Sequence, residues 1–372
     1  MVDLKSQYLA IKSEIDNAIL NVLDSTSFIN GPDVKAFQTD LEKYLDIDNV
    51  ITCANGTDAL QIALMALGLK PGDEVITTDF TFISTVEVIS LLGLTPVLID
   101  IDPDTFNINA DLIENAMTEN TKAIIPVHLF GQCSDMEKIC KLATKYGLYI
   151  IEDTAQALGA DYFNTNNTIK KAGTIGNIGC TSFFPSKNLG AYGDAGAIFT
   201  DDKDLAEKAA SIANHGTNIK YYHDRLGVNS RLDSIQAAIL RIKLKYLDRY
   251  NSARKKIADR YDDYFSDSPK IKIPHRCPFS THIFHQYSII MEGTDRSGLQ
   301  EFLRTNGIPS MIYYPVPLHL QKAFSDINYN AGAFPVTEKI CKKILSLPMH
   351  PDLDNEQLEY IAENIIDYLN KS

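Results

Sequence analysis

A lysine near the middle of the chain has the clearest potential for chemistry. Lys187 lies in the segment CTSFFPSKNLGAYGDAGAIFT, residues 180–200, between a short apolar stretch and a glycine-rich one. In a half-buried pocket, a lysine amine loses proton affinity and becomes a nucleophile towards aldehydes. Ser182, five residues earlier, offers a hydroxyl group to an anion. The glycines after the lysine allow close passage of the backbone, which distinguishes this lysine from one in an ordinary surface loop.

A turn between a predicted strand and a predicted helix could hold an anion. In ANGTDALQIALMALGL, residues 54–69, Asn55, Gly56 and Thr57 stand where the strand ends and the helix begins. Free backbone N–H groups and the positive end of the helix dipole meet at such a turn and favour a phosphate. A simple helix cap by Thr57 or Asp58 is the alternative.

A carboxylate stands at the C-terminal end of a later candidate strand. Asp153 ends the apolar run in LYIIEDTAQALGA, residues 148–160, which is where α/β sheets place their ligands. A buried carboxylate needs a cationic partner, and a protonated pyridine nitrogen is one. An aspartate in that role keeps the ring an electron sink. Gln156 could then hydrogen-bond a ring substituent, whereas the alternative for Asp153 is a cap of the following helix.

An arginine and two histidines are further candidates. In GVNSRLDSIQAAIL, Asn229 and Arg231 precede a long helix, and Arg231 could pair bidentately with a carboxylate or phosphate. A solvated arginine at a helix start is the alternative. Of the eight histidines, only His128 and His319 follow elements that could face a pocket, and a structural role stays open for both. No histidine pair has the spacing of a metal site on a helix, so we expect no metal.

The bulk composition restricts the class of protein. The chain has 372 residues, 45 % of them apolar, and a formal net charge of −13, which argues against nucleic-acid binding. The six cysteines include no C-x-x-C pair, and we expect buried free thiols. The first residues, MVDLKSQYLA, lack the apolar run of a signal peptide, and no stretch is long and apolar enough to predict a membrane span. We therefore expect a cytoplasmic protein.

The chain should divide into two domains. Helices are expected at 3–24 and 34–44, and from residue 49 short apolar strands alternate with helices, which is typical of a mostly parallel sheet covered on both faces. A long helical stretch over 233–265 then leads into a mixed region with a strand expected at 310–314. We predict an α/β domain over residues 1–245 and a smaller α+β domain over residues 246–372.

These segments, in this order, resemble the DegT/StrS family of nucleotide-sugar aminotransferases. The likeness runs from VDLKSQY to the LPMHP near the end, and CTSFFPSKNLG is its most specific part. It implies a homodimer of the type I fold of pyridoxal-phosphate-dependent transferases, which is similar to aspartate aminotransferase. Some relatives dehydrate instead and carry histidine where this chain has Lys187, so the lysine favours transamination.

The resemblance also implies a role for each matched residue. Lys187 would form the Schiff base with pyridoxal 5′-phosphate, Asp153 would pair with the pyridine nitrogen, and Gln156 would lie near the ring hydroxyl. Gly56, Thr57 and Ser182 would hold the phosphate, together with Asn229 of the partner subunit. Phe82 would stack on the ring, with Phe80 as the alternative assignment. The residues expected to face the sugar are Arg231, Tyr314 and His319.

Three segments are most similar in sequence to the family members that aminate a UDP-linked 3-keto N-acetylglucosaminuronic acid with glutamate as donor. They are CTSFFPSKNLG, GVNSRLDSIQAAIL and YYPVPLH. This points to surface-polysaccharide synthesis, such as that of an O-antigen. A neutral dTDP- or UDP-linked 3-keto or 4-keto 6-deoxy sugar is the rival substrate. A regulatory or binding protein on the same fold is the rival without catalysis. A dinucleotide-binding oxidoreductase is disfavoured because ANGTDA has one glycine where G-x-G-x-x-G is needed.

Overall fold

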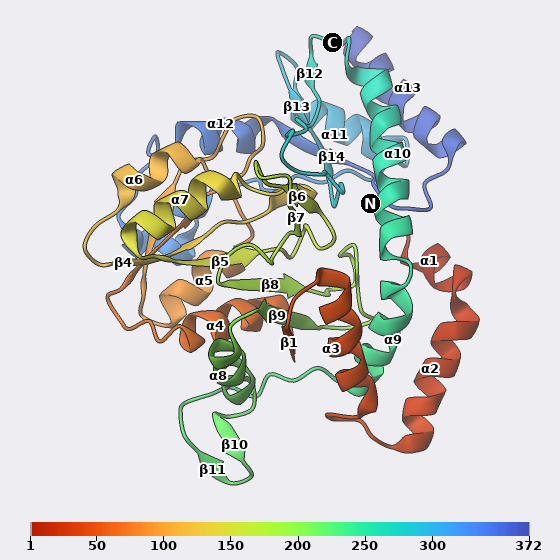
Figure 1. Cartoon of the computed structure of the whole chain (residues 1–372). Coiled ribbons are helices and arrows are strands. Elements are labelled where there is room, and N and C mark those ends of the chain that lie inside the picture. Colours follow the sequence, from red (N-terminus) through yellow and green to blue (C-terminus); the bar gives the residue numbers. More distant parts are fainter. Residues whose placement is uncertain (1, 372) are drawn as a thin grey trace.

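A seven-stranded sheet forms the centre of the larger part of the molecule (Figure 1). The computed structural model describes residues 2–371. From edge to edge the strands are β1 (Asn49–Cys53), β9 (Gly196–Thr200), β8 (Ile178–Ser182), β5 (Tyr149–Asp153), β4 (Thr121–Ile125), β2 (Glu74–Thr78) and β3 (Thr95–Ile99). Only β9 runs antiparallel to its neighbours, so the predicted mixed, mostly parallel sheet is confirmed.

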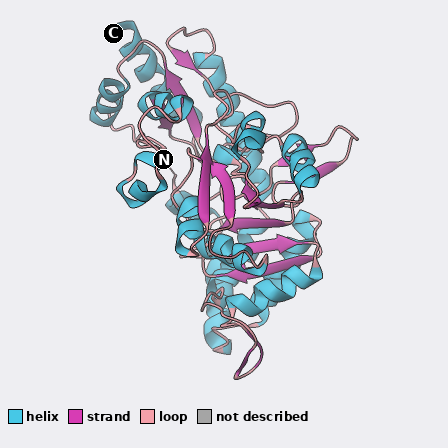
Figure 2. Cartoon of the chain, turned by 90° about the vertical axis from the view of Figure 1, so that its left-hand side faces the viewer, coloured by secondary structure: helices cyan, strands magenta, loops and turns pink. Residues whose placement is uncertain are grey.

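Helices cover both faces of this sheet, as Figure 2 shows from the side. Residues of β4 alternate between the two faces: Ala123 and Ile125 pack with α4 and α8, whereas Ile124 packs with α7. A strand that is apolar on both faces is what a doubly covered sheet requires. The helices of this part are α1 (Leu4–Ala10), α2 (Lys12–Ser25), α3 (Pro32–Leu45), α4 (Gly56–Ala66), α5 (Ser84–Leu91), α6 (Ile113–Ala116), α7 (Met136–Tyr146), α8 (Lys203–Ala213) and α9 (Ser234–Leu244).

The direction of the strands brings the chemical residues to one edge of the sheet. Strands β1, β2, β4, β5 and β8 end at this edge, and each has a candidate residue at its end or in the segment that follows it. Because β9 is reversed, the connection from β8 to β9 also lies there, and it carries Lys187. The carboxyl edge of a parallel sheet is the usual place for a ligand in α/β proteins.

The C-terminal part has a sheet and a core of its own. Strands β12 (Ile271–Lys272), β13 (Tyr287–Met291) and β14 (Ile344–Leu347) form an antiparallel sheet. They pack with α10 (Leu247–Phe265), α11 (Arg296–Thr305) and α13 (Asn355–Lys371) in one apolar cluster. The remaining elements are α12 (Pro335–Lys343) and the hairpins β6–β7 (Asp161–Phe163, Ile169–Lys171) and β10–β11 (Thr217–Ile219, Tyr222–His223). Within residues 2–371, no helix has both the length and the apolar character needed to cross a membrane.

Three expected elements differ from the structure. The helix expected at 3–24 is broken at Ile11, whose backbone leaves the helical region so that its side chain can pack beside α9. The helix expected over 233–265 ends at Leu244 and restarts at Leu247, and the proposed domain boundary falls in this break. No strand forms over 310–314: only Met311 pairs, in a single bridge with Ser346, before the chain turns towards the large sheet.

Candidate active site

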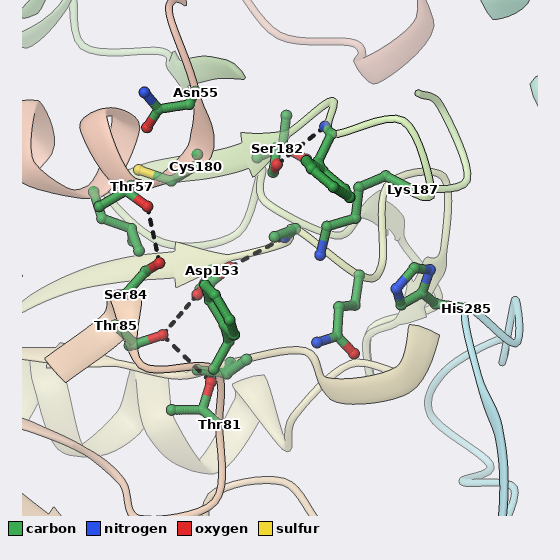
Figure 3. A pocket seen from close by; sticks show the side chains of 18 of the residues that line it. Asn55, Thr57, Thr81, Ser84, Thr85, Asp153, Cys180, Ser182, Lys187 and His285 are labelled. Carbon is green, nitrogen blue, oxygen red and sulfur yellow. Dashed lines mark hydrogen bonds between the residues drawn. The ribbon is translucent and has the colours of Figure 1, made fainter. Parts of the chain in front are cut away.

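A cavity of about 640 Å³ opens at the carboxyl edge of the large sheet. Its walls come from segments that are far apart in the sequence, including the turn before α4, the loop after β2, the end of β5 and the β8–β9 connection (Figure 3). The structure brings together in this cavity eight of the predicted site residues: Gly56, Thr57, Phe82, Asp153, Gln156, Ser182, Lys187 and Tyr314.

The N-terminus of α4 forms the end of the cavity that suits a phosphate. Asn55 caps the helix, because its side chain accepts the N–H of Asp58 at 2.8 Å. The alternative role of Thr57 or Asp58 as the helix cap is therefore wrong. The hydroxyl of Thr57 is left to face Ser84, with the two oxygens 2.8 Å apart. A Cβ atom on Gly56 would lie 2.6 Å from the Cβ of Ser182, so only glycine allows the helix start and the end of β8 to approach so closely.

Asp153 is a buried carboxylate to which no cationic side chain within residues 2–371 is bonded. It is 7 % exposed at the end of β5. One carboxylate oxygen accepts the hydroxyl of Thr85 at 2.9 Å, and the other accepts the N–H of Ala155 at 3.1 Å. Turns, not a helix, follow this residue, so its alternative role as a helix cap is wrong. A buried negative charge held in place in this way is a ready partner for a protonated ring nitrogen.

Lys187 has the environment that the sequence predicted for a nucleophile. Its backbone N–H donates to the carbonyl of Phe184 at 2.8 Å, which folds the loop tightly, and its side chain extends into the cavity (Figure 3). Burial lowers the pKa of its amine from the ordinary 10.5 to about 8, although the charge of Asp153 acts in the opposite direction. Near neutral pH a usable fraction of this amine is uncharged.

Aromatic and amide groups complete the walls. Phe82 is 55 % exposed and lines the cavity, whereas Phe80 is 1 % exposed and packs edge-on against Tyr314. This geometry favours Phe82 over Phe80 as the residue that would stack on the cofactor ring. Gln156 is fixed at both ends, because its oxygen accepts the N–H of Phe130 at 2.8 Å and its nitrogen donates to the hydroxyl of Tyr314 at 3.1 Å. Burial raises the pKa of the Tyr314 phenol, which stays protonated.

Two residues expected at the site lie elsewhere on this chain. Asn229 is exposed, and Arg231 lines a separate depression of about 310 Å³ beside α3 and β1. The resemblance assigned Asn229 to the site of a partner subunit, and a position outside this chain's own cavity is compatible with that assignment for both residues.

His319 also lies outside the cavity. Its ring is completely buried, with Nδ1 2.7 Å from a carboxylate oxygen of Asp79 and Nε2 3.3 Å from one of Glu338. Its backbone N–H also donates to Asp79, whose pKa burial raises to about 6. The carboxylate after β2 thus holds this ring outside the cavity lining, and the role expected for His319 at the sugar stays a prediction.

Several residues of the cavity were not predicted from the sequence. Thr85 orients Asp153, Asn55 caps α4, and His285 enters from the start of β13. An N-cap asparagine before a glycine was a readable signal for Asn55. Nothing in the sequence near His285 indicates that it lies beside Lys187. Among residues 2–371, no group of three or more histidine, cysteine or acidic side chains could hold a metal ion.

The chain belongs to the DegT/DnrJ/EryC1/StrS aminotransferase family, whose model matches residues 9–366. It is therefore a sugar aminotransferase with the type I fold, and its cofactor is pyridoxal 5′-phosphate, as the resemblance implied. The walls described above fit this group: a helix N-terminus with two hydroxyls for the phosphate, a carboxylate for the ring nitrogen, and an amine of low pKa.

The chain is similar over nearly its whole length to proteins with different names. A UDP-2-acetamido-2-deoxy-3-oxo-D-glucuronate aminotransferase from Pseudomonas aeruginosa is 44 % identical over 97 % of this chain and 98 % of its own. A protein from Geobacillus stearothermophilus named a pleiotropic regulatory protein is 47 % identical over 99 % and 98 %. The crystal structure of NtdA from Bacillus subtilis with bound cofactor PMP superimposes with a TM-score of 0.89 at 35 % identity, over 96 % and 82 %. Transaminases of dTDP-linked amino sugars match at 38 % and 40 % identity.

The low pKa of the Lys187 amine can be measured directly. In the cofactor-free protein, labelling of Lys187 by an amine reagent should rise with a midpoint near pH 8. Asp153→Asn should lower this midpoint further, because the carboxylate stabilises the charged amine. Peptide mass spectrometry over a pH series resolves the site, and exposed Lys170 reports the pH dependence of the reagent itself. A midpoint at the ordinary value of a lysine would contradict the buried environment.

Proposed function

We propose that this protein transfers an amino group from glutamate to a UDP-linked 3-keto N-acetylglucosaminuronic acid, in the synthesis of a surface polysaccharide. The observation that carries the proposal is the Lys187 amine of lowered pKa, which shares one cavity with the buried carboxylate of Asp153. The similarity to the Pseudomonas aeruginosa enzyme supports this substrate among those of the family.

The residues of this chain divide the work as follows. Thr57, Ser182 and the N–H groups at the start of α4 would hold the phosphate, and Asp153 would hold the ring nitrogen in its protonated form. When bound, the cofactor supplies an electron sink at the substrate carbon. Phe82 would cover one face of the ring, and Gln156 would lie at its hydroxyl.

Lys187 is the acid and base of the reaction. Its Nζ takes the proton from the Cα of glutamate and returns one at the sugar carbon that receives the amino group. An amine with a pKa of about 8 can do both near neutral pH, because it gains and loses a proton at similar cost.

The charges in the cavity support a shared site in a homodimer. Lys187 is the only lysine or arginine among the described residues that line it, whereas Asp58, Asp153 and Asp194 are acidic. The proposed ligands are all anions: a phosphate, the two carboxylates of glutamate, and a diphosphate-linked uronic acid. This imbalance of charge favours additional cations supplied by a second chain. We propose that a second copy supplies Asn229 to the phosphate and Arg231 to the carboxylate, with Tyr314 facing the sugar.

Two rival functions remain distinct from this proposal. A neutral dTDP-linked keto sugar is the substrate class named for the relatives of 38 % and 40 % identity. A regulatory role is named for the relative from Geobacillus stearothermophilus. A protein that only regulates has no need of an amine and a carboxylate placed in one cavity, and this chain has both Lys187 and Asp153 there.

The glutamate half-reaction tests catalysis. Protein loaded with pyridoxal phosphate should lose its visible absorption band when glutamate is added and regain it with a keto nucleotide-sugar. Lys187→Ala should reduce this turnover by at least about 1,000-fold, because it removes the proposed acid and base of the reaction. Lys170→Ala, at an exposed position, should behave as the wild type. Normal turnover by Lys187→Ala would refute the mechanism.

Mixing of two inactive variants tests the shared site. Lys187→Ala and Asn229→Ala chains should each have low activity alone, whereas refolding them together should restore part of it. One site of each mixed dimer then has both Lys187 and a partner's Asn229. A sedimentation experiment that finds an active monomer would refute the proposal.

Arg231→Ala tests the substrate class. A charge-assisted hydrogen bond contributes about 1.5–3 kcal/mol. Its loss should weaken binding of the 3-keto uronic acid roughly 10- to 100-fold and leave a neutral 4-keto 6-deoxy sugar much less affected. A panel of keto nucleotide-sugars offered to the aminated form measures both, with Arg304→Ala, on the surface of α11, as the control. A clear preference of the wild type for a neutral 4-keto sugar would overturn the uronic acid assignment and leave the transaminase mechanism intact.

A further inference from the structure

We propose that His285 is a positioning residue for the Lys187 amine, acting through a ring nitrogen that is kept free of a proton. A chain of side-chain hydrogen bonds from Asn251 through Asn188 fixes the tautomer of the imidazole. The bare nitrogen then accepts a hydrogen bond from Lys187 whenever that amine is not bound. This inference rests on the proposed role of Lys187 and adds a residue from the C-terminal part of the chain to it.

The orientation of Asn188 determines the tautomer. This residue directly follows Lys187, is 5 % exposed, and contacts three other groups. Its side-chain nitrogen donates to the side-chain oxygen of Asn251 at 2.7 Å and to the backbone carbonyl of Ile283 at 3.3 Å. A carbonyl oxygen can only accept a hydrogen bond, so the side chain of Asn188 must turn its amide nitrogen, not its oxygen, towards the carbonyl of Ile283. Its oxygen therefore faces Nδ1 of His285, at 3.1 Å.

The proton on the ring follows from the same contact. The oxygen of Asn188 can only accept, so Nδ1 of His285 must carry the hydrogen. A neutral imidazole has one N–H, which leaves Nε2 with a lone pair. The ring also stays neutral, because burial and the nearby charges of Lys187 and Arg254 hold its pKa well below the ordinary value.

The backbone around His285 is held firmly. The buried guanidinium of Arg254 donates to the carbonyls of Phe284, His285 and Met349 at 3.2, 3.4 and 3.0 Å. The N–H of His285 donates to the carbonyl of Phe130 at 2.8 Å. The ring is therefore anchored by its own Nδ1 and by its backbone on both sides, and it has little freedom to turn Nε2 away.

A donor and an acceptor without partners thus share one cavity. Within residues 2–371, neither Nζ of Lys187 nor Nε2 of His285 forms a hydrogen bond to the protein, and both residues line the cavity. Figure 3 shows the Lys187 amine and the His285 ring on the same side of it. When the Lys187 amine donates a hydrogen bond to Nε2 of His285, the lone pair of the amine points away from the imidazole and into the cavity. Because the acceptor is neutral, it orients the amine without the strong stabilisation of the charged form that a carboxylate would give.

Two replacements of His285 distinguish the effect of the hydrogen-bond acceptor from the effect of the planar ring. His285→Phe keeps a planar ring and removes the acceptor, whereas His285→Gln replaces Nε2 with an amide oxygen. In the cofactor-free full-length protein, His285→Phe should lower the labelling midpoint of Lys187 by about one pH unit, since a hydrogen bond that favours the charged amine is lost. His285→Gln should keep the midpoint close to that of the wild type.

Kinetics and NMR provide two further measurements. In the loaded enzyme, His285→Phe should lower kcat of the glutamate half-reaction by about 10-fold with KM nearly unchanged, and His285→Gln should recover most of it. Histidine-selective ¹⁵N NMR, assigned by the signal missing from His285→Gln, should show the Nδ1–H tautomer in the wild type. Asn188→Ala, which leaves His285 in place, should shift that signal towards a mixture of tautomers.

Two results would overturn the proposal. One is the Nε2–H tautomer in the wild-type protein. The other is a His285→Phe variant, folded by its urea unfolding curve, that has an unchanged Lys187 midpoint and unchanged kcat. Should His285→Phe fail to fold, the NMR signal of the wild type and of Asn188→Ala decides alone. The labelling and NMR need no cofactor or sugar, so a failure of the proposed function would be seen separately, in the turnover of Lys187→Ala.

Discussion

The buried carboxylate of Asp153 is the constraint around which the site is organised. A charge at 7 % exposure is costly unless a cation or hydrogen bonds compensate it, and here Thr85 and the turn at Ala155 supply hydrogen bonds but no charge. In the proposed function, a cationic ring nitrogen would meet the remaining demand. The same negative charge acts on Lys187 and opposes the effect of burial on its pKa. In the proposed function, one side chain would therefore affect both the cofactor and the base.

The sheet explains why these groups meet at all. Asp153, Ser182 and the start of α4 follow strands that end at one edge, and the reversed strand β9 returns the Lys187 loop to that edge. The alternation of strands and helices predicted an α/β fold with a mostly parallel sheet. The likeness of the lysine segment and of the acidic strand end to a known family then implied the type I fold and the cofactor. Each of these patterns can be recognised within one short segment of the sequence.

What the sequence could not provide depends on contacts between distant segments. His319 was expected at the sugar because it follows a proline-rich turn, but Asp79, 240 positions earlier, holds its ring inward. His285 reaches the cavity from the segment just before β13, and only the three-dimensional arrangement places it beside Lys187. Asn229 and Arg231 were predicted through a likeness, and on this chain both lie outside the cavity. Their function beside a second chain is our proposal.

The inward tie between Asp79 and His319 also affects how the protein could evolve. Asp79 directly precedes the loop that contains Phe82, and His319 closely follows the segment that contains Tyr314. The buried contact between Asp79 and His319 holds one end of each segment in place, and neither of these two residues lines the cavity. Exposed side chains of the second segment, such as Met311 and Val316, can therefore be replaced without releasing its attachment to the large sheet. Such a division between a constant anchor and a variable wall is one route by which a single scaffold can acquire many substrates.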